Sequence, residues 1–257
     1  MTLTLLLLVL VAPLLSRISP QHTFDFVDAK FECPAASGIA GLYPPPYLAW
    51  HERYEPEHIQ DVHNFLRTVI DEDGPYDGVV GFSQGAALAA SFLLAHEHDG
   101  AAEAPFKVAV FLYSVMLFSP SENIGTNIGR EIVVQEEKHT AFLRGLDPSQ
   151  LAGAEMTETA QNSCSHLNDS TTAPPPNVFG FLPETFATRI SIPTLHVVGK
   201  RDPFAEHSRA LVTLCQEDRS EVLLVDGGHE LPRIDAALDR LAEQFELVAL
   251  MGSLGGA

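Results

Sequence analysis

The sequence predicts an α/β protein with a mostly parallel sheet and helices on both faces. Short apolar runs alternate with stretches of helical periodicity, which is the pattern of strands joined by crossover helices. The chain has 257 residues, 46% of them hydrophobic, and this is enough for one sizeable core. We therefore expect a single α/β domain over residues 21–257, preceded by an apolar segment over residues 1–20.

Five apolar runs predict the strands. In chain order they are Thr23–Val27, Tyr76–Phe82, part of Val108–Phe118, Thr194–Val198 and Val222–Val225. Three stretches predict helices, because their apolar residues recur at helical spacing or because they are rich in alanine. The predicted helices are His58–Ile70, which Gly74 and Pro75 end, then Gln84–Leu94, and finally residues 234–250.

The pattern loosens between about residues 119 and 192. This part of the chain contains Ser-, Thr-, Asn- and Pro-rich stretches, such as residues 162–176, that are typical of exposed loops. Connections of this length are usually lids or disordered segments. We expect an irregular lid over residues 119–192 that contributes to a substrate pocket.

The N-terminal segment has two interpretations. Leu3–Leu15 is nearly all apolar but too short for a transmembrane helix, which needs about 20 apolar residues. It fits a buried parallel strand, which we expect over Leu5–Val11, or a secretory signal. Because no Lys or Arg precedes the run and no clear cleavage site follows it, the strand is favoured and a cytoplasmic location is expected.

Composition excludes several classes of function. A formal net charge of −19 argues against nucleic-acid binding, which requires clustered Lys and Arg. The three cysteines are an odd number without CxxC spacing, so neither a disulfide framework nor a zinc site is expected. We expect no metal and no cofactor.

The segment Gly81–Gly85 reads G-x-S-x-G, with Ser83 at its centre. It lies where a predicted strand ends and an Ala-rich helix begins, which is the position of a nucleophile elbow. The turn is tight, and neighbouring chain passes close to it on both sides, so glycine fits where a Cβ would clash. The helix that follows directs the positive end of its dipole at the serine. Ser83 is therefore the candidate nucleophile.

A serine hydroxyl needs a base, and in this architecture the chain order is Ser, then acid, then His. His229 follows the last predicted strand in a Gly-rich loop, whereas the competing His196 lies inside a predicted strand. Asp202 directly follows the preceding strand, at the sheet edge where such sites assemble. Asp226 is an alternative acid but is only three residues from the histidine. We expect His229 as the base and Asp202 as the acid that orients it.

Several segments resemble the fungal serine hydrolase family, also known as FSH1 hydrolases. They are GPYDGVVGFSQGAALAA (74–90), VVGKRDPF (197–204), DGGHELPR (226–233) and FDFVDAKFECPAASGIAGLYPPPYLAW (24–50). The resemblance is weakest over residues 121–188. It implies an α/β-hydrolase fold, hydrolysis of esters or thioesters without a cofactor, and a triad of Ser83, Asp202 and His229.

One departure concerns the oxyanion hole. Family members open with a strand that ends in a His-Gly loop, and this loop donates one N–H. The first twenty residues contain no His-Gly. The backbone N–H of Gln84 can supply one donor, and the second is not identifiable from the sequence. This departure has three explanations: a shortened or misassembled gene product, a weakened enzyme, or an enzyme whose N-terminus supplies the donor differently. We expect a compromised oxyanion hole in which the Gln84 N–H is the only secure donor.

The resemblance implies a small-molecule acyl ester or thioester as the substrate, including a polyketide bound to a carrier protein. It also implies a role in fungal secondary metabolism, such as releasing or trimming a polyketide. The alternative function is that of a non-catalytic protein of the same fold that binds a small molecule or a partner. An intact Ser, Asp and His set argues against this alternative, since a binding module has no need of all three.

Overall fold

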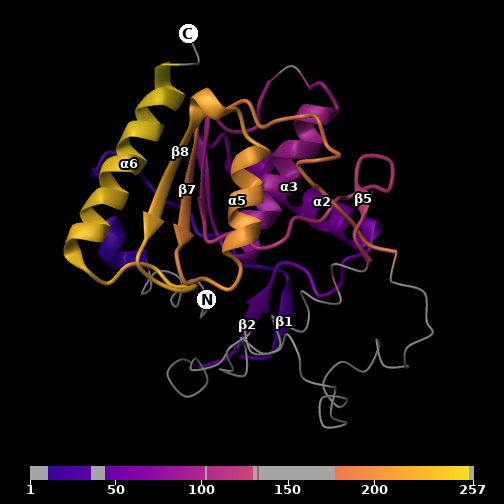
Figure 1. Ribbon diagram of the computed structural model, residues 1–257, viewed down its shortest axis with the longest axis horizontal. Helices are drawn as coiled ribbons and strands as arrows, with labels where there is room; N and C mark the ends of the chain where they lie inside the picture. Colours follow the sequence, from indigo (N-terminus) through magenta and orange to yellow (C-terminus); the bar gives the residue numbers. More distant parts are fainter. Residues whose placement is uncertain (1–10, 36–43, 102, 130–131, 133–176, 255–257) are drawn as a thin grey trace.

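A parallel sheet lies at the centre of the computed structural model, which describes residues 11–35, 44–101, 103–129, 132 and 177–254 (Figure 1). Within these ranges the sheet has the strand order β3-β4-β7-β8, and all three strand pairs are parallel. The strands are β3 (Gly78–Phe82), β4 (Val108–Leu112), β7 (Thr194–Gly199) and β8 (Ser220–Val225). The fold class expected from the sequence is confirmed.

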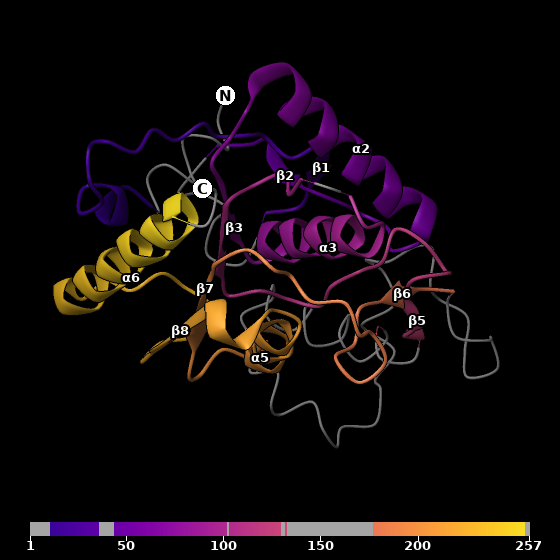
Figure 2. The same cartoon turned by 90° about the horizontal axis from the view of Figure 1, so that it is seen from above.

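Helices cover both faces of this sheet. They are α2 (Pro56–Asp73), α3 (Gln84–His98), α5 (Ala205–Thr213) and α6 (Asp235–Leu254). Figure 2 shows α6 on one side of the sheet and α2, α3 and α5 on the other. Each helix predicted from periodicity is present, whereas the short α5 was not predicted because nine residues give too little pattern to recognise.

Two apolar cores fill the space between the sheet and its helices. Alanines line the core between α3 and the sheet. Ala86 and Ala90 of α3 and Ala109 of β4 are all 0% exposed. Small side chains let a helix approach a sheet closely. The core beneath α6 contains Leu195 and Leu241, which are likewise 0% exposed. The central strands β4 and β7 are thus buried on both faces, as expected of parallel strands, whereas Val80 of β3 and Val222 and Leu224 of β8 are 46–49% exposed at the two edges of the sheet.

The register aligns the carboxyl ends of the strands. Phe82 at the end of β3 pairs with Leu112 at the end of β4, and Gly199 at the end of β7 pairs with Val225 at the end of β8. The turns that follow these strands therefore meet along one edge of the sheet. In an α/β sheet this edge is the usual position of a functional site.

Two antiparallel pairs of short strands flank the main sheet. The first pair is β1 (Phe31–Cys33) with β2 (Tyr47–Ala49), and the second is β5 (Thr126–Asn127) with β6 (Phe179–Gly180). Figure 1 shows β1 and β2 beyond the carboxyl ends of β7 and β8. Neither pair was predicted, because strands of two or three residues carry no measurable alternation.

The predicted strand Thr23–Val27 is wrong. These residues form no strand, and the Phe24 ring packs against Phe245 of α6 at a centroid distance of 5.9 Å. The next residues, Asp25 to Val27, line a shallow depression beside Tyr76. The alternating pattern therefore arises from packing against helices and neighbouring loops rather than from pairing within the sheet.

The predicted N-terminal strand Leu5–Val11 falls mostly outside the described residues. Val11, its last residue, lies in a helical stretch that includes residues 11–15, so the strand prediction is wrong at that position. Leu14 and Ile18 are buried in the core beneath α6. Among the described residues, no helix combines the length and apolar character that crossing a membrane requires.

Two buried histidines give the fold a predictable response to acid. His63 on α2 is 2% exposed, and its Nε2 lies 2.9 Å from Ser91 Oγ. His196 on β7 is 1% exposed, and its Nε2 lies 3.0 Å from Thr194 Oγ1. Burial lowers the pKa of each to about 3. His196 is thus a core residue, as its position inside a predicted strand suggested.

We expect the free energy of unfolding to fall on acidification below pH 6.5. An unfolded histidine has a pKa near 6.5, so between about pH 6.5 and pH 3 the unfolded chain binds more protons than the folded one. Once the unfolded side chains are protonated, each buried histidine lowers the free energy of unfolding by about 1.4 kcal/mol per pH unit. Urea unfolding at pH 7, 6 and 5 measures this slope, and equal stability at the three values would contradict it.

Candidate active site

Ser83 occupies a strained turn between β3 and α3. Its backbone angles, φ 52° and ψ −116°, lie in a region that residues other than glycine rarely adopt. The Ser83 N–H donates to the Leu112 carbonyl at 2.8 Å, which ties the turn to the end of β4. Strain of this kind costs about 1–3 kcal/mol and persists where the surroundings enforce it. The residue is partly exposed.

The two glycines of the motif have different neighbours. A Cβ on Gly81 would lie 2.5 Å from the Ala86 backbone nitrogen, which is impossible without moving the helix. A Cβ on Gly85 would lie 3.2 Å from Nε1 of the Trp50 indole. The sequence predicted that neighbouring chain passes close to both glycines. At Gly81 this neighbour is the start of α3, and at Gly85 it is the side chain of Trp50, which is distant in the sequence.

His229 bridges the serine and the buried aspartate. Its Nε2 lies 2.8 Å from Ser83 Oγ, and its Nδ1 lies 2.9 Å from Asp202 Oδ2. The side chains of His229 and Asp202 are 5% and 0% exposed. These are the contacts expected from the sequence. The alternative acid, Asp226, is exposed and instead forms an ion pair with Lys200 at 2.8 Å, which lowers its pKa.

The turns after β7 and β8 are locked together by their backbones. The Lys200 N–H donates to the Val225 carbonyl, and the Arg201 N–H donates to the Gly227 carbonyl, both at 2.9 Å. Asp202 itself is fixed because its Oδ1 accepts the Phe204 N–H at 2.8 Å. The acid is therefore held at a set position relative to the loop that carries the histidine.

Three aromatic rings surround the imidazole of His229. Phe82, Tyr113 and Phe204 have ring centroids at 5.3, 5.9 and 5.2 Å from it. Tyr113 directly follows β4, is 0% exposed and has a positive φ of 54°. Its hydroxyl has no hydrogen-bond partner among the described residues. These rings restrict the orientation of the imidazole, and their role was not evident from the sequence, because no local motif marks them.

The Gln84 N–H lies at the first position of α3, where backbone donors have no partner within the helix. The Gln84 side chain points to another part of the chain. Its Oε1 accepts the Trp50 N–H at 2.7 Å, and its Nε2 donates to the His51 carbonyl at 3.0 Å. The segment from Trp50 to His51 is thus attached to the turn that carries the serine, a contact that the sequence analysis missed.

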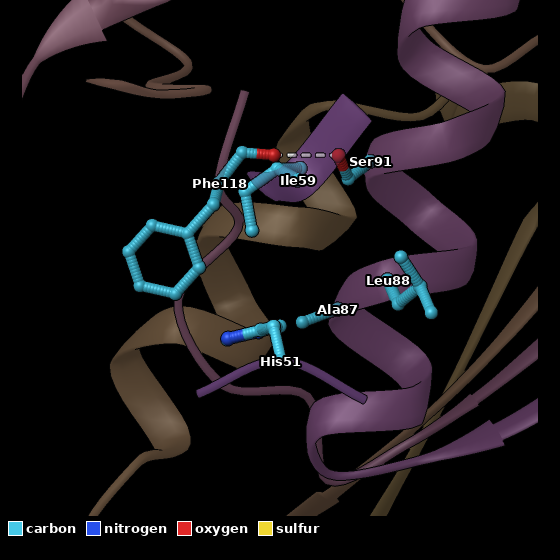
Figure 3. A pocket seen from close by; sticks show the side chains of 6 residues that line it. All are labelled: His51, Ile59, Ala87, Leu88, Ser91 and Phe118. Carbon is cyan, nitrogen blue, oxygen red and sulfur yellow. Dashed lines mark hydrogen bonds between the residues drawn. The ribbon is translucent and has the colours of Figure 1, made fainter. Parts of the chain in front are cut away.

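A small cavity lies along α3 beyond this turn (Figure 3). It is lined by His51, Ile59, Ala87, Leu88, Ser91 and Phe118. Its volume of about 10 Å³ accommodates roughly one water molecule, so this cavity does not hold an acyl chain.

The predicted lid is described only at its two ends, residues 119–129 and 177–192, together with residue 132. The prediction that its central part lines a pocket above the serine lies outside the described residues. Within the described ranges, no three His, Cys, Asp or Glu side chains are grouped as ligands of a metal ion.

Gly199→Ala tests the lock between the two turns. A Cβ at this position would lie 2.3 Å from the Gly228 carbonyl oxygen, so one turn must move and carry Asp202 or His229 with it. A misplacement of about 1 Å can cost roughly 10²-fold in rate, and we expect a fall in kcat of this size with the fold retained. Gly227→Ala is the matched control, because its Cβ would make an ordinary contact at 3.4 Å. Equal rates in the two variants would contradict the idea.

The parallel sheet, the strained serine turn and the Ser–His–Asp contacts together define an α/β hydrolase. The chain belongs to the serine hydrolase (FSH1) family, whose family model matches residues 12–241. The resemblance noted in the sequence is therefore confirmed.

Curated relatives agree with this assignment. The chain is 30% identical to Esterase alnB of Emericella nidulans over 240 residues, which is 86% of this chain and 84% of the relative. It is 25% identical to Hydrolase FUB4 of Gibberella moniliformis, over 90% of this chain and 88% of that protein. Among solved structures, Arabidopsis thaliana SOBER1 aligns with 93% of this chain and 91% of its own, at 11% identity and a TM-score of 0.45.

Proposed function

We propose that the protein is a serine esterase in which Ser83 is the nucleophile, His229 the general base and Asp202 the residue that orients the base. The observation that supports this most strongly is the position of the imidazole, with one nitrogen at 2.8 Å from the serine hydroxyl and the other at 2.9 Å from a buried carboxylate. Because Nδ1–H donates a hydrogen bond to Asp202, the proton of the neutral imidazole is held on Nδ1, and Nε2 is left free to take the proton of Ser83.

The reaction proceeds through an acyl-enzyme. Ser83 Oγ attacks the ester carbonyl as His229 removes its proton, and a tetrahedral intermediate forms. The imidazolium, stabilised by Asp202, returns the proton to the leaving alcohol or thiol. A water molecule, activated by His229, then attacks the acyl-serine and releases the acid. The Gln84 N–H and the positive end of the α3 dipole stabilise the negative charge on the oxygen in both steps.

The substrate that we propose is a small-molecule acyl ester. The family assignment and the relative named as an esterase support this class. Thioesters, including a polyketide chain on a carrier protein, are a second candidate, because the same attack on a thioester carbonyl expels a thiolate, which is a better leaving group than an alkoxide. A role in fungal secondary metabolism rests on the family resemblance.

Labelling with a fluorophosphonate probe tests the proposal. The probe phosphonylates an activated serine and releases fluoride, so the wild-type chain should gain one adduct, located at Ser83 by peptide mass spectrometry. Rates on matched p-nitrophenyl esters and acyl thioesters of the same chain length then rank the two substrate classes. A folded protein that takes no label and hydrolyses neither class is instead the non-catalytic binding protein, and the proposed function is then wrong.

A further inference from the structure

The indole of Trp50 presents its N–H edge to the turn that carries Ser83. The two indole atoms nearest to a Cβ built on Gly85 are Nε1 at 3.2 Å and Cδ1 at 3.8 Å. Gly85 is two residues beyond the serine and lies in the first turn of α3. A helical Cβ points toward the N-terminus of its helix, and α3 begins directly after Ser83, so the indole N–H packs against the side of Gly85 that is directed toward the start of the helix.

This donor has no acceptor in the described part of the chain. The backbone N–H of Trp50 donates to Gln84 Oε1, but the indole N–H makes no hydrogen bond there. The side chain is partly exposed, as expected of a residue at the mouth of a site. Tryptophan N–H groups usually find a hydrogen-bond partner when they are buried, so a ligand that covers this side chain can supply the acceptor here.

The indole is also held in place. Trp50 directly follows β2, and the Gln84 side chain binds the backbone on both sides of the Trp50–His51 peptide, at 2.7 and 3.0 Å. Figure 3 shows the His51 side chain beside Ala87 of α3. The residue whose backbone N–H serves as the first oxyanion donor thus uses its side chain to fix the segment that carries the indole. A donor fixed before the reaction needs no reorganisation when charge develops.

We propose that the indole N–H of Trp50 is the second donor of the oxyanion hole, together with the backbone N–H of Gln84. This inference deepens the proposed function and rests on it. As Ser83 attacks, the electron pair of the carbonyl bond moves to oxygen, and both N–H groups hydrogen-bond to the resulting oxyanion without transferring a proton. The pair returns when the leaving group departs. The expectation of a compromised oxyanion hole is replaced by one in which a side chain completes it.

The test uses the fact that Trp50 is the single tryptophan of the chain. Replacing it by 3-benzothienylalanine keeps the shape of the ring and substitutes sulfur for the N–H group. We expect kcat for a p-nitrophenyl ester to fall by about 10²-fold while KM changes little, because the hydrogen bond strengthens in the transition state. Trp50→Phe should give a loss of the same order. A kcat equal to that of the wild type in the benzothienyl protein would overturn the inference.

A second readout observes the hydrogen bond itself. In a ¹⁵N-labelled protein the single indole N–H gives one resonance, and a trifluoromethyl ketone that adds to Ser83 mimics the tetrahedral intermediate. We expect the indole proton to move downfield when the adduct forms, and to stay unchanged in Ser83→Ala, which cannot form it. An adduct seen by ¹⁹F NMR with an unmoved indole resonance overturns the role of Trp50 alone. If no adduct and no fluorophosphonate label form at Ser83, the proposed function itself fails.

Discussion

Replacing Ser83 by alanine is expected to lower kcat for p-nitrophenyl esters by roughly 10⁴–10⁶-fold, the range found when a hydrolase loses its nucleophile. The hydroxyl contacts His229 at 2.8 Å and lies on a partly exposed turn, so its removal disturbs little packing. Steady-state rates measure the loss, and circular dichroism establishes that the variant is folded.

Ser91→Ala is a useful control for this experiment. Ser91 lies on the same helix and is 2% exposed, and its hydroxyl bonds the Phe118 carbonyl at 2.5 Å rather than any member of the triad. Its removal should lower stability by about 1–3 kcal/mol, because the buried Phe118 carbonyl loses a partner, and should leave the rate largely intact. Full turnover in the Ser83 variant would remove that serine from the mechanism.

Asp202→Asn is expected to lower kcat by about 10⁴-fold with a preserved fold. The asparagine has nearly the same shape, but its amide no longer fixes the Nδ1 proton of His229, so the imidazole presents the wrong tautomer to Ser83. The Asp202 side chain is 0% exposed and accepts hydrogen bonds from both His229 and the Phe204 N–H, so solvent does not screen its charge.

Asp226→Asn is the matched control for the acid. Asp226 has the same side chain as Asp202, lies on the loop that carries His229, and was the alternative acid predicted from the sequence. It is exposed, however, and forms an ion pair with Lys200. Exposed ion pairs contribute about 0–1 kcal/mol, so both stability and rate should change little. A larger loss of rate in the Asp226 variant than in the Asp202 variant would show that the acid is assigned wrongly.

The central sheet could be predicted because its physical signal is local. A buried parallel strand such as Thr194–Gly199 is a continuous apolar run, and the helices before and after it carry periodic apolar stripes. The same signal predicted where the site residues lie. Ser83, Asp202 and His229 are each in the turn that follows a strand, and parallel strands end along one edge of the sheet. Chain order then identified their partners.

The remaining features depend on contacts that no local pattern records. Apolar and polar residues alternate over Thr23–Val27 as in a strand, but the Phe24 ring packs against Phe245, which is more than two hundred residues away in the sequence. The short strands β1 and β2 pair across residues 34–46, a connection much longer than the loops of about two to five residues that mark a hairpin in a sequence. Trp50 was visible only as the end of a segment that resembles the family, because its contact with Gly85 exists only after the chain has folded.

The contact between Trp50 and the serine turn also determines what the intrinsic fluorescence of this protein reports. With one tryptophan in the chain, all indole emission comes from the active site, whereas far-ultraviolet circular dichroism follows the helices and the sheet. Coincident transitions in denaturant mean that the site and the sheet unfold as one unit. An emission change at lower denaturant means that the segment carrying Trp50 opens first, so that activity is lost while most of the structure persists.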